Sequence, residues 1–295
     1  MVDRFQDHCS SGTRGAFCAG AVAALLPPAV ELTDLPMIKE NRAARLREAG
    51  IETIEDLWKA DPGVLGKHPS FINDPGFLNS QLPLLQGFAR AHHEKQALVY
   101  AADPRIYELR EPIIHMDLEF DGPRSEIFLY GMLDHASEEV TSWFDASRAG
   151  QKRMLTDFRD LCKDQSPTMV TWGGASSDTV QLRRACDRHG LPSKWVNEVH
   201  WFDLQNEVVY TNNPESQRVY LPVRKFKSEK VAQYFGYEKP RLRVKDGYHA
   251  LKLYRSYRQR PDVQIERDLT EYNAEDIRHT RIILEGLREL MRPLL

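Results

Sequence analysis

Residues 113–120 read Ile113-Ile114-His115-Met116-Asp117-Leu118-Glu119-Phe120, an apolar run interrupted by two acids. A short run so rich in isoleucine, leucine, methionine and phenylalanine favours a buried strand. Side chains alternate between the two faces of a strand, so Asp117 and Glu119 share one face and Met116, Leu118 and Phe120 the other. Neighbouring carboxylates on a buried strand repel each other and resist desolvation. A bound cation would relieve both costs, so this strand predicts a metal site.

The chain around this strand shows alternating strand and helix patterns from residue 110 to residue 295. Short connections between the first strand candidates favour an antiparallel three-strand meander, at residues 113–120, 126–133 and 141–144. A fourth strand is expected at residues 169–172. Helical patterns account for most of the remainder, at residues 151–162, 178–189, 227–235, 247–257 and 267–291. This order predicts the α/β class, with a mixed sheet flanked by helices.

Residues 1–100 have a different pattern and are expected to form a small helical subdomain. A short amphipathic helix ends at Gly50, where glycine is favoured, and Thr53 can cap a second helix over residues 54–60. The unit at about residues 34–60 resembles a helix-hairpin-helix, whose backbone amides contact a nucleic-acid phosphate, but it lacks the glycine-rich hairpin of strong examples. Two interpretations stay open, a phosphate contact and a packing subdomain.

The composition is that of an ordinary soluble globular protein, with 41% hydrophobic residues, 28% charged residues and a net charge of −3. Binding of a polyanion would therefore need a local basic patch. The four irregularly spaced cysteines suit a reducing cytoplasm better than a disulfide scaffold. No apolar run approaches 18 residues, so no membrane span is expected. Residues 19–30 are not expected to be a signal peptide.

Three further acidic or phenolic residues have positions that suit a shared site with Asp117 and Glu119. Asp178 follows the Gly/Ser-rich turn after the fourth strand and is expected to start a helix, where an aspartate can also be an ordinary cap. Tyr272 and Asp276 are four residues apart, so they share one face of the last helix. That face is otherwise apolar, so a carboxylate on it needs a partner. The partner could be a buried cation or hydroxyl of the protein, or it could be the same metal site.

The ordered set of these motifs resembles the DEDD 3′–5′ exonucleases of the RNase H-like superfamily, in the subgroup with a tyrosine in the last motif. The resemblance covers about residues 110–291, and the most similar branch is the predicted exonuclease domains found alone or fused to RecB-type nuclease modules. The phrase Tyr272-Asn-Ala-Glu-Asp276-Ile-Arg-His-Thr280 is typical of that branch.

The resemblance implies an RNase H-like fold and a role for each motif residue. Two divalent ions, Mg²⁺ or Mn²⁺, would be held by four carboxylates, Asp117, Glu119, Asp178 and Asp276. Tyr272 would orient the attacking water, because its ordinary pKa makes a phenol a poor free base. The implied activity is metal-dependent 3′–5′ hydrolysis of single-stranded DNA or RNA ends.

Several alternatives stay open at this stage. Asp203 competes with Asp178 as the third carboxylate, although a supporting role such as a helix cap suits it better. Ser177 stands where many relatives carry a phenylalanine, which puts substrate stacking there in doubt. A structure-specific endonuclease on the same fold and a catalytically silent nucleic-acid-binding module are the alternative functions. The substrate sugar, the pathway and the oligomeric state are undetermined.

A local excess of positive charge lies between residues 224 and 245. Cations with interleaved aromatic residues suit a groove that binds a nucleic-acid strand. The residues predicted to bind the strand are Arg224, Lys225, Lys227, Lys230, Arg241, Arg243 and Lys245. The interleaved aromatic residues are Tyr220, Phe226, Tyr234, Phe235 and Tyr237. A solvated helix face with ordinary core aromatics is the alternative.

Two weaker signals concern metal ligands and the first strand. Cys9 and Cys18 could belong to a metal knuckle, but two cysteines alone cannot complete a four-ligand site. His115 shares the face of Asp117, where it could support the metal site, although a hydrogen-bonded core histidine is the more ordinary interpretation.

Overall fold

The computed structural model describes residues 31–295 apart from residue 225 and the side chain of residue 176. Cys9 and Cys18 therefore lie outside the described residues, as does the first part of the expected N-terminal subdomain. Within the described ranges, no helix combines the length and the apolar character that crossing a membrane requires.

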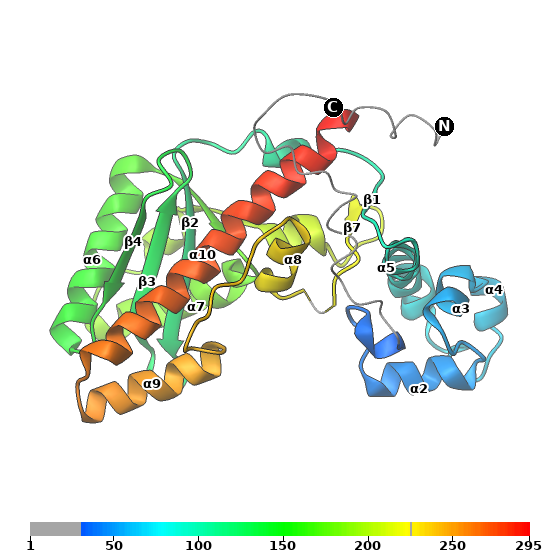
Figure 1. The fold of residues 1–295 in the computed structure, drawn as a ribbon, viewed down its shortest axis with the longest axis horizontal. Coiled ribbons are helices and arrows are strands. Elements are labelled where there is room, and N and C mark those ends of the chain that lie inside the picture. The colour runs from blue at the N-terminus through cyan, green and yellow to red at the C-terminus, as the bar shows by residue number, and fades with distance from the viewer. Residues whose placement is uncertain (1–30, 225) are drawn as a thin grey trace.

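A mixed five-stranded sheet forms the centre of the larger part of the molecule (Figure 1). Its strands are β2 (Ile113–Asp121), β3 (Glu126–Asp134), β4 (Val140–Phe144), β5 (Thr168–Thr171) and β6 (His200–Asp203). Their order is β4-β3-β2-β5-β6, with β2, β3 and β4 antiparallel and with β5 parallel to both β2 and β6. The predicted meander and mixed sheet are thus confirmed. Strand β6 was not predicted from the sequence.

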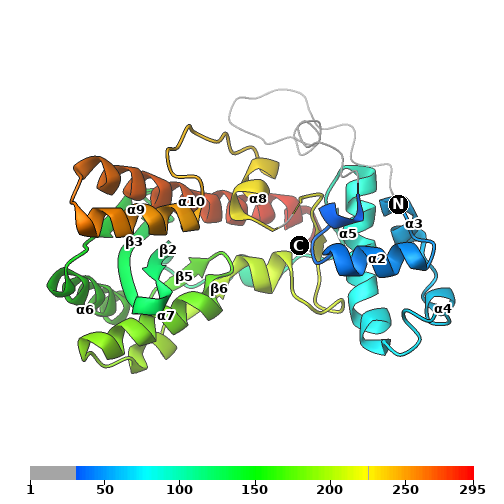
Figure 2. The same ribbon diagram turned by 90° about the horizontal axis from the view of Figure 1, so that it is seen from below.

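The two faces of β2 contact different helices, as its sequence predicts. Met116 and Leu118 pack in one apolar cluster with residues of α6 (Arg148–Gln165) and α7 (Gly174–His189). The opposite, acidic face lies under α10 (Val263–Met291), with α9 (Gly247–Gln259) beside it. Figure 2 shows the resulting three layers, with α6 and α7 on one side of the sheet and α9 and α10 on the other.

Helix α7 begins earlier than predicted, because its N-terminus is capped from another strand. The helix starts at Gly174 rather than at Asp178, which places Asp178 in the second turn. Gly173 precedes it with a φ of +69°, a conformation that glycine adopts without a steric penalty. The Gly173 and Ala175 amides donate to the Asp203 carboxylate over 2.8 and 3.3 Å. Asp203 is distant in sequence, so the local pattern could not reveal this cap.

The N-terminal helices pack around an apolar core of their own. They are α2 (Glu40–Glu48), α3 (Ile54–Lys59), α4 (Pro62–Leu65) and α5 (Leu82–Glu94). Thr53 caps α3 as expected, since its hydroxyl accepts a hydrogen bond from the Asp56 amide at 3.0 Å. The turn between α2 and α3 contains Gly50 with a φ of +80°. Figure 1 shows these helices beyond the end of the sheet.

A short two-stranded sheet joins the N-terminal helices to the rest of the chain. Strand β1 (Leu98–Val99) follows α5 and pairs antiparallel with β7 (Val219–Tyr220). Tyr220 belongs to the core of the N-terminal helices, where its ring lies edge-on to Phe88. Helix α8 (Ser228–Tyr234) and several short 3-10 or π helices complete the fold. The short helices lie at Leu32–Asp34, Phe77–Gln81, Pro104–Ile106, Gly122–Arg124, Lys194–Asn197, Gln205–Val209 and Arg292–Leu294.

Candidate active site

Three of the predicted carboxylates meet between β2 and α10. Asp117 and Glu119 come from the strand and Asp276 from the helix, and one oxygen of each lies within 4.8 Å of the others. The pairing of β2 with β3 shifts register between Glu119 and Phe120. Such an irregularity re-aims side chains locally and is common beside active sites. The structure thus brings together residues from the first strand of the large sheet and from the last long helix, close enough to share a cation.

The carboxylates of this cluster are held in an environment that disfavours their charge. Burial raises the pKa of Asp117 well above its ordinary value, and the charges of Glu119, Asp276 and Asp178 raise it further. Burial, followed by Asp276 and Asp178, does the same to the pKa of Glu119. Without a cation, the ionised form of both groups is therefore disfavoured. A divalent cation would remove this repulsion and stabilise the ionised forms.

Asp178 lies close to the cluster without belonging to its tightest part. It is 7% exposed, and its charge raises the pKa of both Asp117 and Glu119. Burial and the charge of Asp203 raise the pKa of Asp178 to about 7, against a lowering by a 3.1 Å hydrogen bond from Ser177. A Cβ added at Gly174 would lie 2.1 Å from Asp178 Oδ2, so this glycine leaves room for the carboxylate.

The raised pKa of Asp178 gives a pH-dependent stability in the absence of metal. Between its ordinary value of 3.8 and about 7, the folded side chain holds a proton that the unfolded chain has released. The free energy of unfolding therefore falls as pH rises through this window, and levels off above it. We expect Asp178→Asn to reduce this fall by about 1–3 kcal/mol, measured by urea unfolding in EDTA between pH 5.5 and 8.

The matched control for this measurement is Asp164→Asn, which changes an exposed carboxylate on α6. Its stability should follow the wild-type pH dependence. A wild-type slope in Asp178→Asn would show that Asp178 ionises freely in the folded protein.

Asp203, the competing candidate for the third carboxylate, is occupied with hydrogen bonds to the backbone. Besides the two amides that begin α7, it accepts bonds from the Gln205 and Asn206 amides at 3.0 and 3.1 Å. The Asn206 side-chain amide adds a further bond at 2.9 Å. Asp203 thereby joins the ends of β5 and β6, which is the supporting role that suits its position in the sequence.

Tyr272 lies one helical turn before Asp276, as the i, i+4 spacing predicts. The pKa of its hydroxyl is raised by burial first and then by the charges of Asp276 and Glu119. The phenol therefore stays protonated across the physiological range. A protonated phenol beside the cluster can donate a hydrogen bond and orient a water, but it cannot act as a base.

Asn273 is a site residue that the sequence reasoning missed. Its Nδ2 donates to Asp117 Oδ2 over 2.8 Å, and the residue is fully buried. Opposite Asp117, strand β3 carries Gly131, where an added Cβ would lie 2.2 Å from Asn273 Oδ1. The glycine therefore lets α10 approach the sheet closely enough for Asn273 to hold Asp117. An asparagine next to the predicted tyrosine, on the same buried stripe, was the available signal.

His279 is a second residue that was missed. It is buried, and its Nδ1 lies 3.3 Å from Asp276 Oδ1, one turn further along α10. The Tyr237 ring packs edge-on against the imidazole with 4.5 Å between centroids. The contact restricts the orientation of the Asp276 carboxylate. The i, i+3 spacing from Asp276 is visible in the sequence.

His115 is a buried, hydrogen-bonded histidine of the core. Its Nδ1 lies 3.1 Å from the Thr280 hydroxyl on α10, and its Nε2 lies 3.0 Å from His135 Nδ1. Both ring nitrogens thus have protein partners. His115 is therefore a hydrogen-bonded core histidine, the more ordinary of the two interpretations. It connects α10 to β2 beside Asp117.

Several predicted strand-binding cations are paired with acids of the protein. Arg224 forms an ion pair with Asp34 of the N-terminal helical part. Lys230 lies 3.7 Å from Glu229, and Arg243 Nη1 lies 3.6 Å from an oxygen of Asp268. The cations of these pairs are exposed and can exchange the protein carboxylate for a phosphate. Among the described residues, Lys227, Arg241 and Lys245 have no ion-pair partner, and Lys225 lies outside that range.

The aromatic residues of this segment are buried or partly buried and pack against the core, which disfavours the stacking role considered for them. Tyr220 and Tyr234 are 6% and 4% exposed. Phe226 packs on Phe88 and Tyr210, and Phe235 packs against Gly286 of α10. Interleaving with cations did not distinguish a stacking surface from a core, because both use the same residue types.

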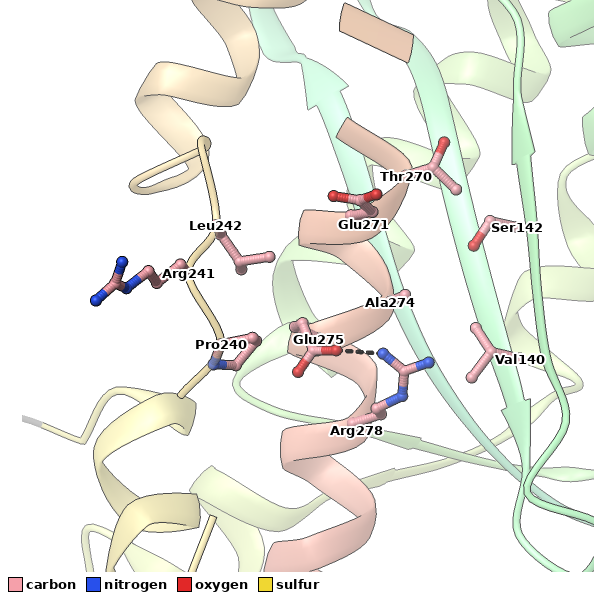
Figure 3. A pocket seen from close by; sticks show the side chains of 10 residues that line it. All are labelled: Val140, Ser142, Pro240, Arg241, Leu242, Thr270, Glu271, Ala274, Glu275 and Arg278. Atoms are coloured by element: carbon pink, nitrogen blue, oxygen red, sulfur yellow. Dashed lines mark hydrogen bonds and ion pairs between the residues drawn. The ribbon is translucent and has the colours of Figure 1, made fainter. Parts of the chain in front are cut away.

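A groove of about 490 Å³ lies along the flank of α10, away from the carboxylates. Figure 3 shows it between α10, the edge strand β4 and the loop that carries Pro240, Arg241 and Leu242. The Arg241 guanidinium points away from α10 in this view. Its lining holds Glu271 and an ion pair of Arg278 with Glu275, and none of the predicted catalytic residues lines it.

The donor set of the candidate active site fits a hard divalent cation. It consists of carboxylate oxygens, without a cysteine or a histidine among the clustered ligand atoms of the described residues. Oxygen ligands suit Mg²⁺ and Mn²⁺, whereas zinc sites in proteins usually include nitrogen or sulfur. The raised pKa values of Asp117 and Glu119 are consistent with a site built to be neutralised by a cation.

Known proteins offer two points of comparison, in sequence and in structure. No curated protein matches the chain in sequence. Among solved structures, the family B DNA polymerase from the hyperthermophilic archaeon Pyrobaculum calidifontis is similar, with 19% identity and a TM-score of 0.44. The similarity covers 61% of this chain and 24% of the polymerase chain, so this chain matches about a quarter of that protein.

A family model gives the stronger result. The model described as RNase_H superfamily matches residues 114–288, which is more than half of the chain and includes all the predicted catalytic residues. The matched segment runs from the start of β2 to near the end of α10, the two elements that carry the carboxylate cluster. The chain therefore belongs to the RNase H superfamily.

Proposed function

We propose that the protein is a divalent-metal-dependent 3′–5′ exonuclease that hydrolyses single-stranded DNA or RNA ends. One observation carries the proposal, the convergence of Asp117, Glu119 and Asp276 within 4.8 Å. The ordered motif resemblance to the tyrosine-type DEDD exonucleases supports it, and that subtype and the relation to RecB-type nucleases stay predictions.

Asp117, Glu119, Asp178 and Asp276 would hold two ions, Mg²⁺ or Mn²⁺. When bound, such ions supply a hydroxide-like nucleophile and stabilise the leaving oxygen of a phosphodiester. The protein's own contribution is to keep the carboxylates in place. Asn273 holds Asp117 by its 2.8 Å hydrogen bond, and His279 contacts Asp276 at 3.3 Å.

Tyr272 has a separate role in the proposed reaction. Because its raised pKa keeps the phenol protonated, Tyr272 donates a hydrogen bond and takes no proton from the attacking water. Its position beside Asp276 places the donor at the edge of the carboxylate cluster. We infer that it orients the water or a non-bridging phosphate oxygen.

Nucleic acid is the proposed partner, and the cations without an ion pair in the described chain are the first candidates for phosphate contacts. Lys227, Arg241 and Lys245 belong to this group. Arg224, Lys230 and Arg243 would join them by exchanging a protein carboxylate for a phosphate. Lys225 completes the predicted set.

The test uses the full chain, Mn²⁺ or Mg²⁺, and single-stranded DNA and RNA oligonucleotides labelled at one end. A 3′–5′ exonuclease should give a ladder that shortens from the 3′ end of a 5′-labelled strand. The same enzyme should release a labelled mononucleotide at once from a 3′-labelled strand. EDTA should abolish both products, and circular single-stranded DNA should survive.

Other outcomes would identify the alternatives. Cleavage of the circle, with internal fragments from both labelled strands, would indicate an endonuclease. Binding without cleavage at any metal concentration would leave a silent nucleic-acid-binding module.

A further inference from the structure

We propose that Tyr248, at the start of α9, is a stacking platform for a nucleobase of the substrate beside the carboxylate cluster. The inference rests on the proposed nuclease function and assigns a binding residue that the motifs do not contain. Tyr248 would position the end of the nucleic-acid strand by stacking on the ring of a base, independently of the phosphate contacts.

The first observation is proximity to the site. Helix α9 begins at Gly247, and a Cβ added there would lie 4.0 Å from Glu119 Oε2. A side chain at Gly247 would thus reach contact distance of a carboxylate of the cluster. A ring on the next residue is near enough to meet a base whose own phosphate is bound at that cluster.

The second observation is that Tyr248 is exposed on a rigid element. Its side chain is 67% exposed, whereas α9 is held firmly at its other end. Arg255 makes two 3.0 Å hydrogen bonds to Asp121, and the buried Tyr254 ring stacks on Phe128 with 3.9 Å between centroids. Single exposed aromatic residues are common on protein surfaces, so the exposure gains meaning only from this location.

The third observation is the charge around the ring. Lys252, one turn along α9, places its ammonium 4.4 Å from the centroid of the Tyr248 ring. Arg243 and Lys245 are exposed just before the helix. An aromatic face with neighbouring cations matches the chemistry of single-strand binding, in which bases stack on rings and phosphates meet positive charge. The aromatics of residues 220–237, which are buried or partly buried, are less available for such a contact.

The experiment compares Tyr248→Ala and Tyr248→Phe on two substrates. One is a 5′-labelled single strand with normal bases, and the other lacks the bases of its last three nucleotides. We expect Tyr248→Ala to lower kcat/KM on the normal strand by about tenfold, mainly through KM, since stacking contributes this much per base. Tyr248→Phe should behave as wild type, because stacking does not use the hydroxyl.

The strand without terminal bases separates stacking from a general defect. On it, Tyr248→Ala and wild type should be equal, because no base is present to stack. An equal loss on both strands, or no loss on either, would overturn the inference. The stabilisation by Mn²⁺ in thermal unfolding checks that the variant keeps its metal site.

The matched control is Tyr100→Ala, which removes a tyrosine of similar exposure, 60%, just after β1. This variant should bind and cleave as wild type. A binding measurement keeps the inference distinct from the nuclease proposal. Fluorescence anisotropy with a phosphorothioate oligonucleotide should show about tenfold weaker binding by Tyr248→Ala even if the wild type cleaves nothing. If Tyr248→Ala binds the oligonucleotide as tightly as wild type and the wild type cleaves nothing, both the stacking inference and the nuclease proposal are overturned.

Discussion

Asp117→Asn is expected to lower phosphodiester hydrolysis by about a thousandfold or more, because it removes a carboxylate from the centre of the cluster. The substitution keeps the shape of the side chain, and the new amide oxygen can still accept the hydrogen bond from Asn273. The fold should therefore survive. The measurement is the initial rate on a 5′-labelled single strand in Mn²⁺.

The same variant should change the thermal stability in a direction that an ordinary damaging mutation would not. In EDTA at pH 8, it removes a buried charge that is repelled by Glu119, Asp276 and Asp178, so the melting temperature should rise. The stabilisation of wild type by Mn²⁺ should be lost in the variant. A full Mn²⁺ response together with normal activity would exclude Asp117 as a ligand.

Asp121→Asn is the matched control, since it changes another aspartate of the same strand, one that is fully buried. Asp121 accepts two 3.0 Å hydrogen bonds from Arg255 and thereby anchors α9. Its neutralisation should lower the melting temperature while the response to Mn²⁺ persists. The melting temperature should thus rise in Asp117→Asn and fall in Asp121→Asn. This difference distinguishes a carboxylate that is repelled by its neighbours from one that is paired with an arginine.

Gly131→Ala is expected to displace α10 from the sheet and to disturb the site from the opposite strand. The new Cβ would lie 2.2 Å from Asn273 Oδ1 and 2.4 Å from Ile277 Cδ1, and both residues are fully buried. Such overpacking costs about 1–3 kcal/mol, which corresponds to a melting temperature lowered by about 3–10 °C. Because Asp276 moves with α10, activity should fall by about a hundredfold.

Gly76→Ala serves as the control for this prediction, since nothing lies within 4 Å of a Cβ added at Gly76. Its stability should remain within about 0.5 kcal/mol of wild type. Wild-type stability and activity in Gly131→Ala would mean that α10 does not need this close approach. A loss of activity without a loss of stability would assign Gly131 a local effect on Asn273 alone.

Much of the site could be read from the sequence, because its residues lie on elements with strong periodic patterns. The period of two along residues 113–120 placed Asp117 and Glu119 on one face, and the i, i+4 spacing did the same for Tyr272 and Asp276. An acid on an otherwise apolar stripe is costly, so each pattern called for a partner. The structure packs the two stripes against each other, so that their acids form one cluster which a single cation could neutralise.

The tertiary structure alone decided which residues support the site and which only fill the core. The start of α7 depended on Asp203 from another strand, and the close approach of α10 depended on Gly131 opposite Asp117. The aromatics of residues 220–237 were predicted as a stacking surface and are buried or partly buried, whereas Tyr248 carried no pattern and is exposed next to Gly247, which faces Glu119. Periodicity depends on neighbours within one element, so the sequence by itself determined the faces of β2 and α10. Caps, close approaches and exposure depend on segments far apart in the chain, so only the packing of those segments could determine them.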